Sequence, residues 1–208
     1  MDFQEIEKTA RRYQKGNEPA HDWQHVQRVA KIGRELAEKE GADPETVRAA
    51  ALLHDVGRSK EREDIIEDHA EWGAEKAREV LDRSEFPEEK IEDVVHCIRT
   101  HRYSTGPEPE TLEARVLFDA DNLDSMGAVG IARSFSFAGE RGNAMVDPEI
   151  PPEKDDTPDG RTALNHLEKR MLELRDLMHT DAARRIAEEK HEFVEQYIER
   201  FKKEMRIS

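Results

Sequence analysis

The stretch AALLHDVGR, residues 50–58, follows an apolar run with two ionisable side chains, His54 and Asp55. The five apolar residues at 49–53 indicate a buried helix. A buried imidazole or carboxylate costs several kcal/mol unless it is hydrogen-bonded, ion-paired or bound to a metal. His54 and Asp55 therefore need a compensating partner that the rest of the chain must supply.

Apolar residues recur at helical spacing along most of the 208 residues, and no segment alternates like a strand. Asp22 and Asp43 suit the N-cap positions of two helices, and Pro44 suits the first helical position after Asp43. The segment GRSKEREDIIED, residues 57–68, is predicted as a charged connection. The sequence predicts an all-α fold with helices over about 2–15, 22–41, 44–56, 68–82, 88–102, 109–122 and 126–138.

Residues 139–161 hold four prolines and three glycines, a composition typical of a flexible loop or lid. From about Thr162 to Arg206 the apolar spacing predicts two long amphipathic helices. The inner face of the first is marked by Leu167, Met171, Leu174 and Met178, and that of the second by Ile186, Phe193, Tyr197 and Phe201.

The net charge of −15, with no basic run, argues against binding to a nucleic-acid polymer or an anionic membrane. An anionic substrate would need a local positive centre, such as a metal ion or a few arginines. The N-terminus lacks a signal-type apolar core, no apolar stretch reaches membrane-spanning length, and Cys97 is the only cysteine. These features predict a cytoplasmic protein.

A second inward-facing histidine is found at position 25, on the same helical face as Val29, Ile32 and Leu36. Two inward histidines and Asp55 on neighbouring helices favour a metal site, because one cation compensates all three. Imidazole and carboxylate together suit Mn, Fe, Co, Ni or Zn better than Mg.

A further acidic ligand is expected from LFDADNLDSMG, residues 117–127. This segment offers Asp119, Asp121 and Asp124, and the helical period does not choose among them.

The remaining histidines fall into two groups. His101 shares an inward stripe with Val94 and Ile98, and His69 opens a helix, where it could be a cap, a substrate contact or a ligand. The others are predicted to face solvent: His96, His166, His179 and His191.

The order of His25, the His54–Asp55 pair and an acid in DADNLD resembles the HD-domain superfamily of metal-dependent phosphohydrolases. HDWQHVQRVA, AALLHDVGR, DHAEWGA, RTHRYS and LFDADNLDSMGAVGIARSF are similar to its stand-alone single-domain branch. The resemblance covers about residues 5–205 apart from the 139–161 loop. It implies one HD-type domain over 1–208, a helical bundle with its core at about 20–125 and a C-terminal helical part at about 162–206.

The resemblance also implies site residues. The metal ligands would be His25, His54, Asp55 and Asp121, and Asp119 and Asp124 would lie behind them or act in catalysis. His69 and His101 occupy places where two-metal members bind a second ion, with Asp55 bridging, and where one-metal members contact phosphate. One tight metal site is expected, and a weak second site stays open.

The expected reaction is hydrolysis of a phosphoester or phosphoanhydride, in a nucleotide, by a metal-activated water. Asp124 or an oxygen of Asp121 could take the proton of that water, which adds Asp124 to Asp55, Arg58 and His69 as catalytic candidates. The substrate-binding candidates are Arg58, Lys60, Arg28, His69, His101 and Arg133.

Two alternatives remain. The first is a di-iron oxygenase that uses the six-residue set His25, His54, Asp55, His69, His101 and Asp121. The second is a non-catalytic helical metal-binding module. The expected partner is a small phosphate-containing anion, and the expected assembly is a monomer or a homodimer.

Overall fold

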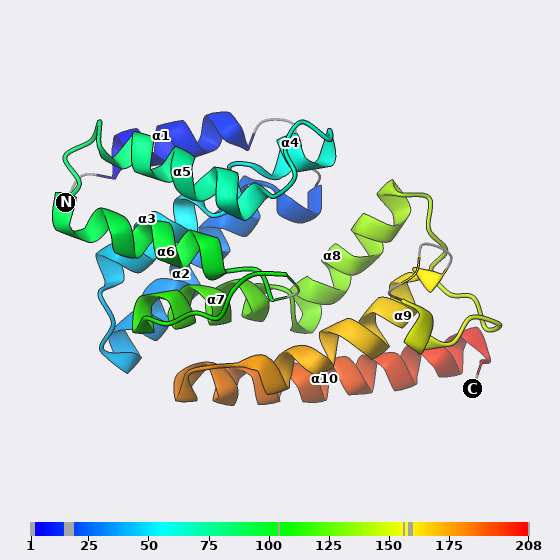
Figure 1. Cartoon of the computed structure of the whole chain (residues 1–208). Helices are drawn as coiled ribbons and strands as arrows, with labels where there is room; N and C mark the ends of the chain where they lie inside the picture. The colour runs from blue at the N-terminus through cyan, green and yellow to red at the C-terminus, as the bar shows by residue number, and fades with distance from the viewer. Residues whose placement is uncertain (1–2, 15–18, 104, 156, 158–159, 208) are drawn as a thin grey trace. The chain divides into compact units, whose positions relative to one another are not determined.

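The computed structural model describes residues 3–14, 19–103, 105–155, 157 and 160–207 (Figure 1). Within these ranges the regular structure is helical, and no strand is present. The predicted all-α class is therefore confirmed.

The chain divides into two compact units, Met1–Asp121 and Asn122–Ser208. The prediction of a single domain over 1–208 stays a prediction. The first unit holds α1 (Gln4–Tyr13), η1 (Pro19–His21), α2 (Trp23–Glu40), α3 (Pro44–Leu53), α4 (Arg58–Arg62), α5 (His69–Leu81), η2 (Glu88–Lys90), α6 (Ile91–Thr100) and most of α7 (Leu112–Asp124).

Helix α2 begins and ends where the sequence predicts. The Asp22 side chain accepts a hydrogen bond from the backbone N–H of His25 at 3.0 Å, which caps the N-terminus. Gly41 ends the helix with a left-handed φ of 81°. Because Asp22 caps this end, His25 is fixed in the first turn of α2.

Helix α3 packs against α2 and α6 in the core of the first unit. Gly33 allows the close approach of α2, since a Cβ at this position would lie 2.9 Å from Val47 Cγ1. Helix α3 ends at Leu53, three residues earlier than predicted, so His54 directly follows its last turn. This packing brings the first turn of α2 to the C-terminal end of α3.

The predicted connection at 57–68 contains a five-residue helix, α4, which the charged composition did not indicate. In this helix the backbone N–H groups of Lys60 and Glu61 donate hydrogen bonds to the Gly57 carbonyl oxygen at 3.0 and 3.1 Å. A short helix has few apolar positions, so hydrophobic periodicity cannot reveal it. Helix α4 places Arg58, Lys60 and Glu61 close to the His54–Asp55 pair in sequence.

The second unit holds α8 (Gly127–Glu140), η3 (Pro152–Lys154), α9 (Ala163–His166), η5 (Leu167–Met171), η6 (Glu173–Leu177) and α10 (Asp181–Met205). The first of the two predicted C-terminal helices is not uniform. Leu172 N–H donates to the Leu167 carbonyl, a π-type bond, before a 3₁₀ segment follows. The predicted inner stripe of this segment is buried nonetheless: Leu167, Met171, Leu174 and Met178.

The predicted inner stripe of the last helix is wrong at Phe193, whereas Ile186, Tyr197 and Phe201 are half-buried at the edge of the packed face. Phe193 is 46% exposed, whereas the buried face of α10 carries Ala183, Ala187, His191, Val194 and Ile198. Small alanines let α10 pack closely, so the larger apolar residues did not mark the core side. The prediction that His191 faces solvent is corrected for the same reason.

Beyond Glu140, where α8 ends, the 139–161 segment is mainly non-helical in its described residues, as predicted, apart from the short η3 turn. Asp155 is buried and lies 3.6 Å from both His166 Nδ1 and Arg170 Nε. The flexibility of the 139–161 segment stays a prediction.

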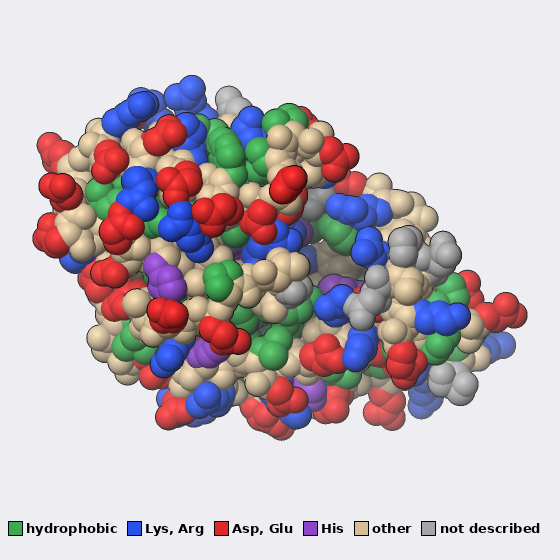
Figure 2. All heavy atoms as spheres, in the orientation of Figure 1, with side chains coloured by type: hydrophobic (Ala, Val, Ile, Leu, Met, Phe, Trp, Pro, Cys, Tyr) green, Lys and Arg blue, Asp and Glu red, His purple; other side chains and the backbone are tan. Residues whose placement is uncertain are grey.

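Within the described ranges no helix is long and apolar enough to span a bilayer. Figure 2 shows acidic and basic side chains interspersed over the visible face, in line with the 39% of charged residues.

Asp43 provides a test of the first-unit framework. Its carboxylate accepts from Thr46 Oγ1 at 2.6 Å and lies 2.8 Å from Lys90 Nζ, while capping α3. Asp43→Ala should lower the free energy of unfolding by about 1–2 kcal/mol, because an N-cap is lost. Asp43→Asn keeps the cap and should lose at most about 1 kcal/mol. Urea unfolding measures both, and equal losses would contradict the capping role.

Candidate metal centre

One cluster of potential ligands joins three helices of the first unit. His25 from α2, His54 from the end of α3 and Asp121 from α7 each offer an atom within 4.8 Å of the others. The Asp121 Oδ1 atom lies 3.4 Å from His25 Nε2 and 3.8 Å from His54 Nε2. Both imidazoles are buried, and the Asp121 side chain is 23% exposed.

A second cluster holds Asp55, His69 from the start of α5 and His101 from the end of α6. His69 Nε2 lies 3.3 Å from Asp55 Oδ1, and His101 Nε2 lies 3.9 Å from the same oxygen. All three side chains are at most 2% exposed. These groups are therefore withdrawn from bulk water.

The Asp55 carboxylate lies between the two clusters. Its Oδ2 atom is 3.7 Å from His25 Nε2 and 3.6 Å from His54 Nε2, while Oδ1 faces the second cluster. The prediction grouped Asp55 with His25, His54 and Asp121 for one metal, and with His69 and His101 as well where two metals bind. The structure gives Asp55 one oxygen toward each group of histidines.

Backbone carbonyls fix the ring orientation of two histidines. His54 Nδ1 lies 2.7 Å from the Ala51 carbonyl oxygen, and His101 Nδ1 lies 2.6 Å from that of Ile98. A carbonyl oxygen only accepts, so each Nδ1 must carry the ring proton. In the neutral rings, Nε2 then presents a lone pair to the clusters, as a metal ligand requires.

The clusters contain contacts that protein groups alone do not satisfy. The Nε2 atoms of His69 and His101 lie 3.3 Å apart, and so do those of His25 and His54. Asp55 Oδ2 is buried and has no hydrogen-bond partner in the described part of the chain. Two nitrogens bound tetrahedrally to one ion at about 2.1 Å lie about 3.4 Å apart. The donors present therefore fit divalent metal binding.

The carboxylates of the clusters are stabilised as anions. Burial alone would raise the pKa of Asp55, but Arg58, His54 and His69 hold it well below its usual range. Burial likewise opposes the lowered pKa of Asp121, which follows from the neighbouring His54, His25 and His101. Burial, with the nearby His54 and His69, lowers the pKa of His101 to about 3. Anionic oxygens and a neutral imidazole are the forms that bind metal.

Of the three acids in the DADNLD segment, the structure brings Asp121 into a cluster with His25 and His54. Asp119 is also fully buried but belongs to neither cluster. Asp124 belongs to the second unit, where its Oδ2 accepts a hydrogen bond from Arg133 Nη1 at 2.8 Å.

The cationic candidates of the first unit occupy different settings. Arg58 Nη1 lies 3.5 Å from Asp55 Oδ1, and its side chain is 29% exposed. Lys60 Nζ lies 5.4 Å from the centre of the Trp72 ring, a cation–π contact. Arg28 is half-buried on α2, one turn after His25.

Two residues of the site were missed from the sequence. Glu61 Oε2 accepts from His69 Nδ1 at 2.7 Å, and Arg102 Nη1 donates to Glu61 Oε1 at 2.9 Å. The hydrogen bond from His69 and the charge of Arg102 lower the pKa of Glu61 to about 2. Glu61 was hidden in a run of charged residues, and only the tertiary contact distinguishes it.

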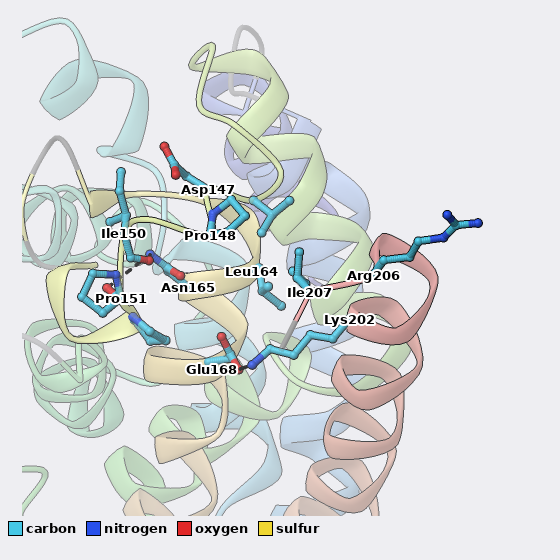
Figure 3. Close-up of a pocket in the computed structure, with 12 residues that line it drawn as sticks. Asp147, Pro148, Ile150, Pro151, Leu164, Asn165, Glu168, Lys202, Arg206 and Ile207 are labelled. Carbon is cyan, nitrogen blue, oxygen red and sulfur yellow. Dashed lines mark hydrogen bonds and ion pairs between the residues drawn. The ribbon is translucent and has the colours of Figure 1, made fainter.

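A separate cavity of about 470 Å³ lies in the second unit (Figure 3). The described residues that line it belong to the 146–152 segment, α9, η5 and the C-terminal end of the chain. Its Lys202 is paired with Glu168 at 2.7 Å, and Arg206 points away from the cavity. The two metal-ligand clusters belong to the first unit.

Comparison with known proteins identifies relatives over nearly the whole chain. The sequence model of the HD domain matches residues 22–126, which include both clusters. The uncharacterized protein YpgQ of Bacillus subtilis is 34% identical over 189 residues, covering 89% of this chain and 84% of YpgQ.

Among the similar solved structures, three illustrate the likeness over nearly the whole chain. A Lactobacillus plantarum protein has a TM-score of 0.80 at 28% identity, covering 98% of this chain and 96% of that one. An HD-superfamily hydrolase from Bacillus thuringiensis has a TM-score of 0.76 at 34% identity, covering 99% and 97%. YpgQ of B. subtilis, in complex with ADP, has a TM-score of 0.75 at 34% identity, covering 95% and 97%.

Asp55 should be required for metal binding. Asp55→Asn removes the negative charge while keeping the size of the side chain, and should weaken Mn²⁺ binding at least about 100-fold. Titration of metal-free protein by calorimetry measures the affinity. Asp82→Asn, at an exposed position of the same unit, is the matched control and should bind as the wild type does. Unchanged Mn²⁺ affinity in Asp55→Asn would refute the assignment.

Proposed function

This chain belongs to the HD-domain family, and on that premise we propose that it is a metal-dependent hydrolase of phosphoester or phosphoanhydride bonds in a nucleotide. The observation that carries the proposal is the buried Asp55 carboxylate, which presents one oxygen to each of two histidine clusters. Such a carboxylate is costly to bury without a cation.

We propose His25, His54, Asp55 and Asp121 as the residues that hold the ion. A bound divalent cation supplies a water of lowered pKa and neutralises negative charge on a phosphoryl group. The nitrogen and oxygen donors suit Mn, Ni, Co, Fe or Zn, with Mg less favoured.

Arg58 is proposed as the main contact to the phosphate of the substrate. Its guanidinium lies beside Asp55 and is partly exposed, so it can turn from the carboxylate to an incoming oxygen. The net charge of −15 makes such a local cation necessary for binding an anion. Lys60, Arg28, His101 and Arg133 remain further candidates for substrate contact.

Proton transfer is proposed to involve carboxylates of α7. Asp121 has a partly exposed carboxylate at the first cluster and is suited to accept a proton from an attacking water. Asp124 stays an alternative acceptor, with one oxygen bonded to Arg133. His69, whose Nδ1 donates to Glu61, would orient the reacting groups through Nε2.

A nucleotide is the proposed substrate class for two reasons. The structural relative YpgQ, 34% identical, was solved in complex with ADP. An arginine beside the candidate metal centre, with a lysine on the same short helix, suits a phosphate chain. The monomeric or homodimeric state and the cytoplasmic location stay predictions.

A second candidate function is a di-iron oxygenase. The observation that favours it is that six potential ligands form two adjoining clusters of three, with Asp55 extending between them. Two irons for each chain and oxygen consumption by the purified protein would support this alternative. Hydrolysis with a redox-inactive ion would exclude it as the main activity.

Hydrolysis is tested with metal-free protein supplied with Mn²⁺ and a panel of nucleoside mono-, di- and triphosphates. Chromatography of the products should show cleavage that a chelator abolishes, because the ligand clusters then hold no cation. Asp55→Ala should reduce the rate at least about 100-fold. Asp82→Ala serves as the control and should retain the wild-type rate. Full activity in Asp55→Ala would contradict the proposed site.

Arg58→Ala tests the proposed phosphate contact. Loss of a charge-assisted hydrogen bond should raise KM about tenfold or more on the best substrate of the panel. Arg62→Ala, on the exposed side of the same short helix, should leave KM within about twofold. If both variants change KM equally, the effect of Arg58 is nonspecific charge and the contact is wrong.

A further inference from the structure

Three histidines of the two clusters, His54, His69 and His101, differ in how the ring proton is held. His54 and His101 are the C-cap residues of α3 and α6, and each donates to a carbonyl three residues earlier. The last four carbonyls of a helix lack partners within it, so a helix C-terminus offers such acceptors. Orientation of these two rings is therefore provided by the backbone.

His69 has the opposite location, as the first residue of α5. A helix N-terminus presents free N–H groups and no free carbonyls, so it cannot hold an Nδ1 proton in the same way. The acceptor is instead the side chain of Glu61, whose Oε2 lies 2.7 Å from His69 Nδ1. The backbone N–H of His69 also donates to Glu61 Oε1, at 3.3 Å.

Arg102 holds Glu61 in place. Its Nη1 atom lies 2.9 Å from Glu61 Oε1 and 2.9 Å from Asp68 Oδ2. Asp68 is the N-cap of α5 and accepts from the N–H groups of Ala70 and Glu71. Arg102 thus ties Glu61 on α4 to the first turn of the helix that carries His69.

The ring of His69 also has a competing acceptor. Asp55 Oδ1 lies 3.3 Å from Nε2, so a neutral His69 could carry its proton there instead. A proton on Nε2 would occupy the lone pair that faces Asp55 and His101. The shorter contact to Glu61 favours the proton on Nδ1.

We infer that Glu61, clamped by Arg102, is a positioning residue that keeps the ring proton of His69 on Nδ1 and turns the Nε2 lone pair toward Asp55 and His101. The contribution of His69 to the site rests on the proposed function. The location of the ring proton does not, and it is measurable without metal or substrate.

The experiment records ¹⁵N chemical shifts of the histidine rings in metal-free protein at about pH 9, well above the ordinary pKa of an imidazole. Wild-type His69 should carry its proton on Nδ1. In Glu61→Ala the proton should move to Nε2, because the remaining acceptors, Asp55 Oδ1 and the lone pair of His101 Nε2, both face that nitrogen. Glu61→Gln keeps an acceptor oxygen and should show a mixture of the two His69 tautomers weighted toward Nδ1. Arg102→Gln should also show a mixture, because Glu61 is then held less firmly.

Zn²⁺ titration followed on the His69 resonances supplies a second readout. Binding should weaken at least about tenfold in Glu61→Ala and recover in part in Glu61→Gln. Glu63→Ala, at an exposed position beyond the end of α4, is the matched control and should change neither readout.

A proton that stays on Nδ1 in Glu61→Ala, or that lies on Nε2 in the wild type, would overturn the inference. If Glu61→Ala does not fold, the Glu61→Gln and Arg102→Gln variants decide. A His69 proton that stays fully on Nδ1 in both variants refutes the inference. Failure of the proposed function would instead appear as undiminished hydrolysis by Asp55→Ala, with the tautomer of His69 unaffected.

Discussion

The buried carboxylate of Asp55 is the constraint on which the first unit depends. Asp55 is only 1% exposed, and its carboxylate is surrounded by four imidazoles and one guanidinium. Placing a charge in such a position is unfavourable unless opposite charge and hydrogen bonds compensate it. The C-terminal ends of α3 and α6, the start of α5 and the first turn of α2 all meet at this carboxylate. The packing of these helices therefore also sets the geometry of the site.

The sequence predicts much of this framework through local signals. Asp22, Gly41, Asp43 and Pro44 mark helix boundaries because caps and left-handed glycines act within a few residues. His54 and Asp55 are conspicuous because they end an apolar run. Their convergence with His25 follows from helical periodicity, and the structure brings these residues together.

Other parts of the site lie beyond local signals. Asp119 and Asp124 are buried like the apolar residues around them on α7, so the helical period does not distinguish a polar face. Asp121 was selected among the three acids by the family resemblance. Glu61 and Arg102 are 41 residues apart and meet only in the folded chain. The buried stripe of α10 was misjudged in its first half, where alanines rather than large apolar residues form it.

The placement of His54 and His101 at helix ends has a consequence for how the centre can be redesigned. Their ring orientations are properties of the main chain, so substitutions around them leave the acceptor carbonyls intact. Of these three rings, that of His69 is the one held by a side chain, so substitutions at residue 61 should change the metal preference of the centre. A protein engineer can vary this position to alter one side of the centre while the helical scaffold and the opposite ligands keep their geometry.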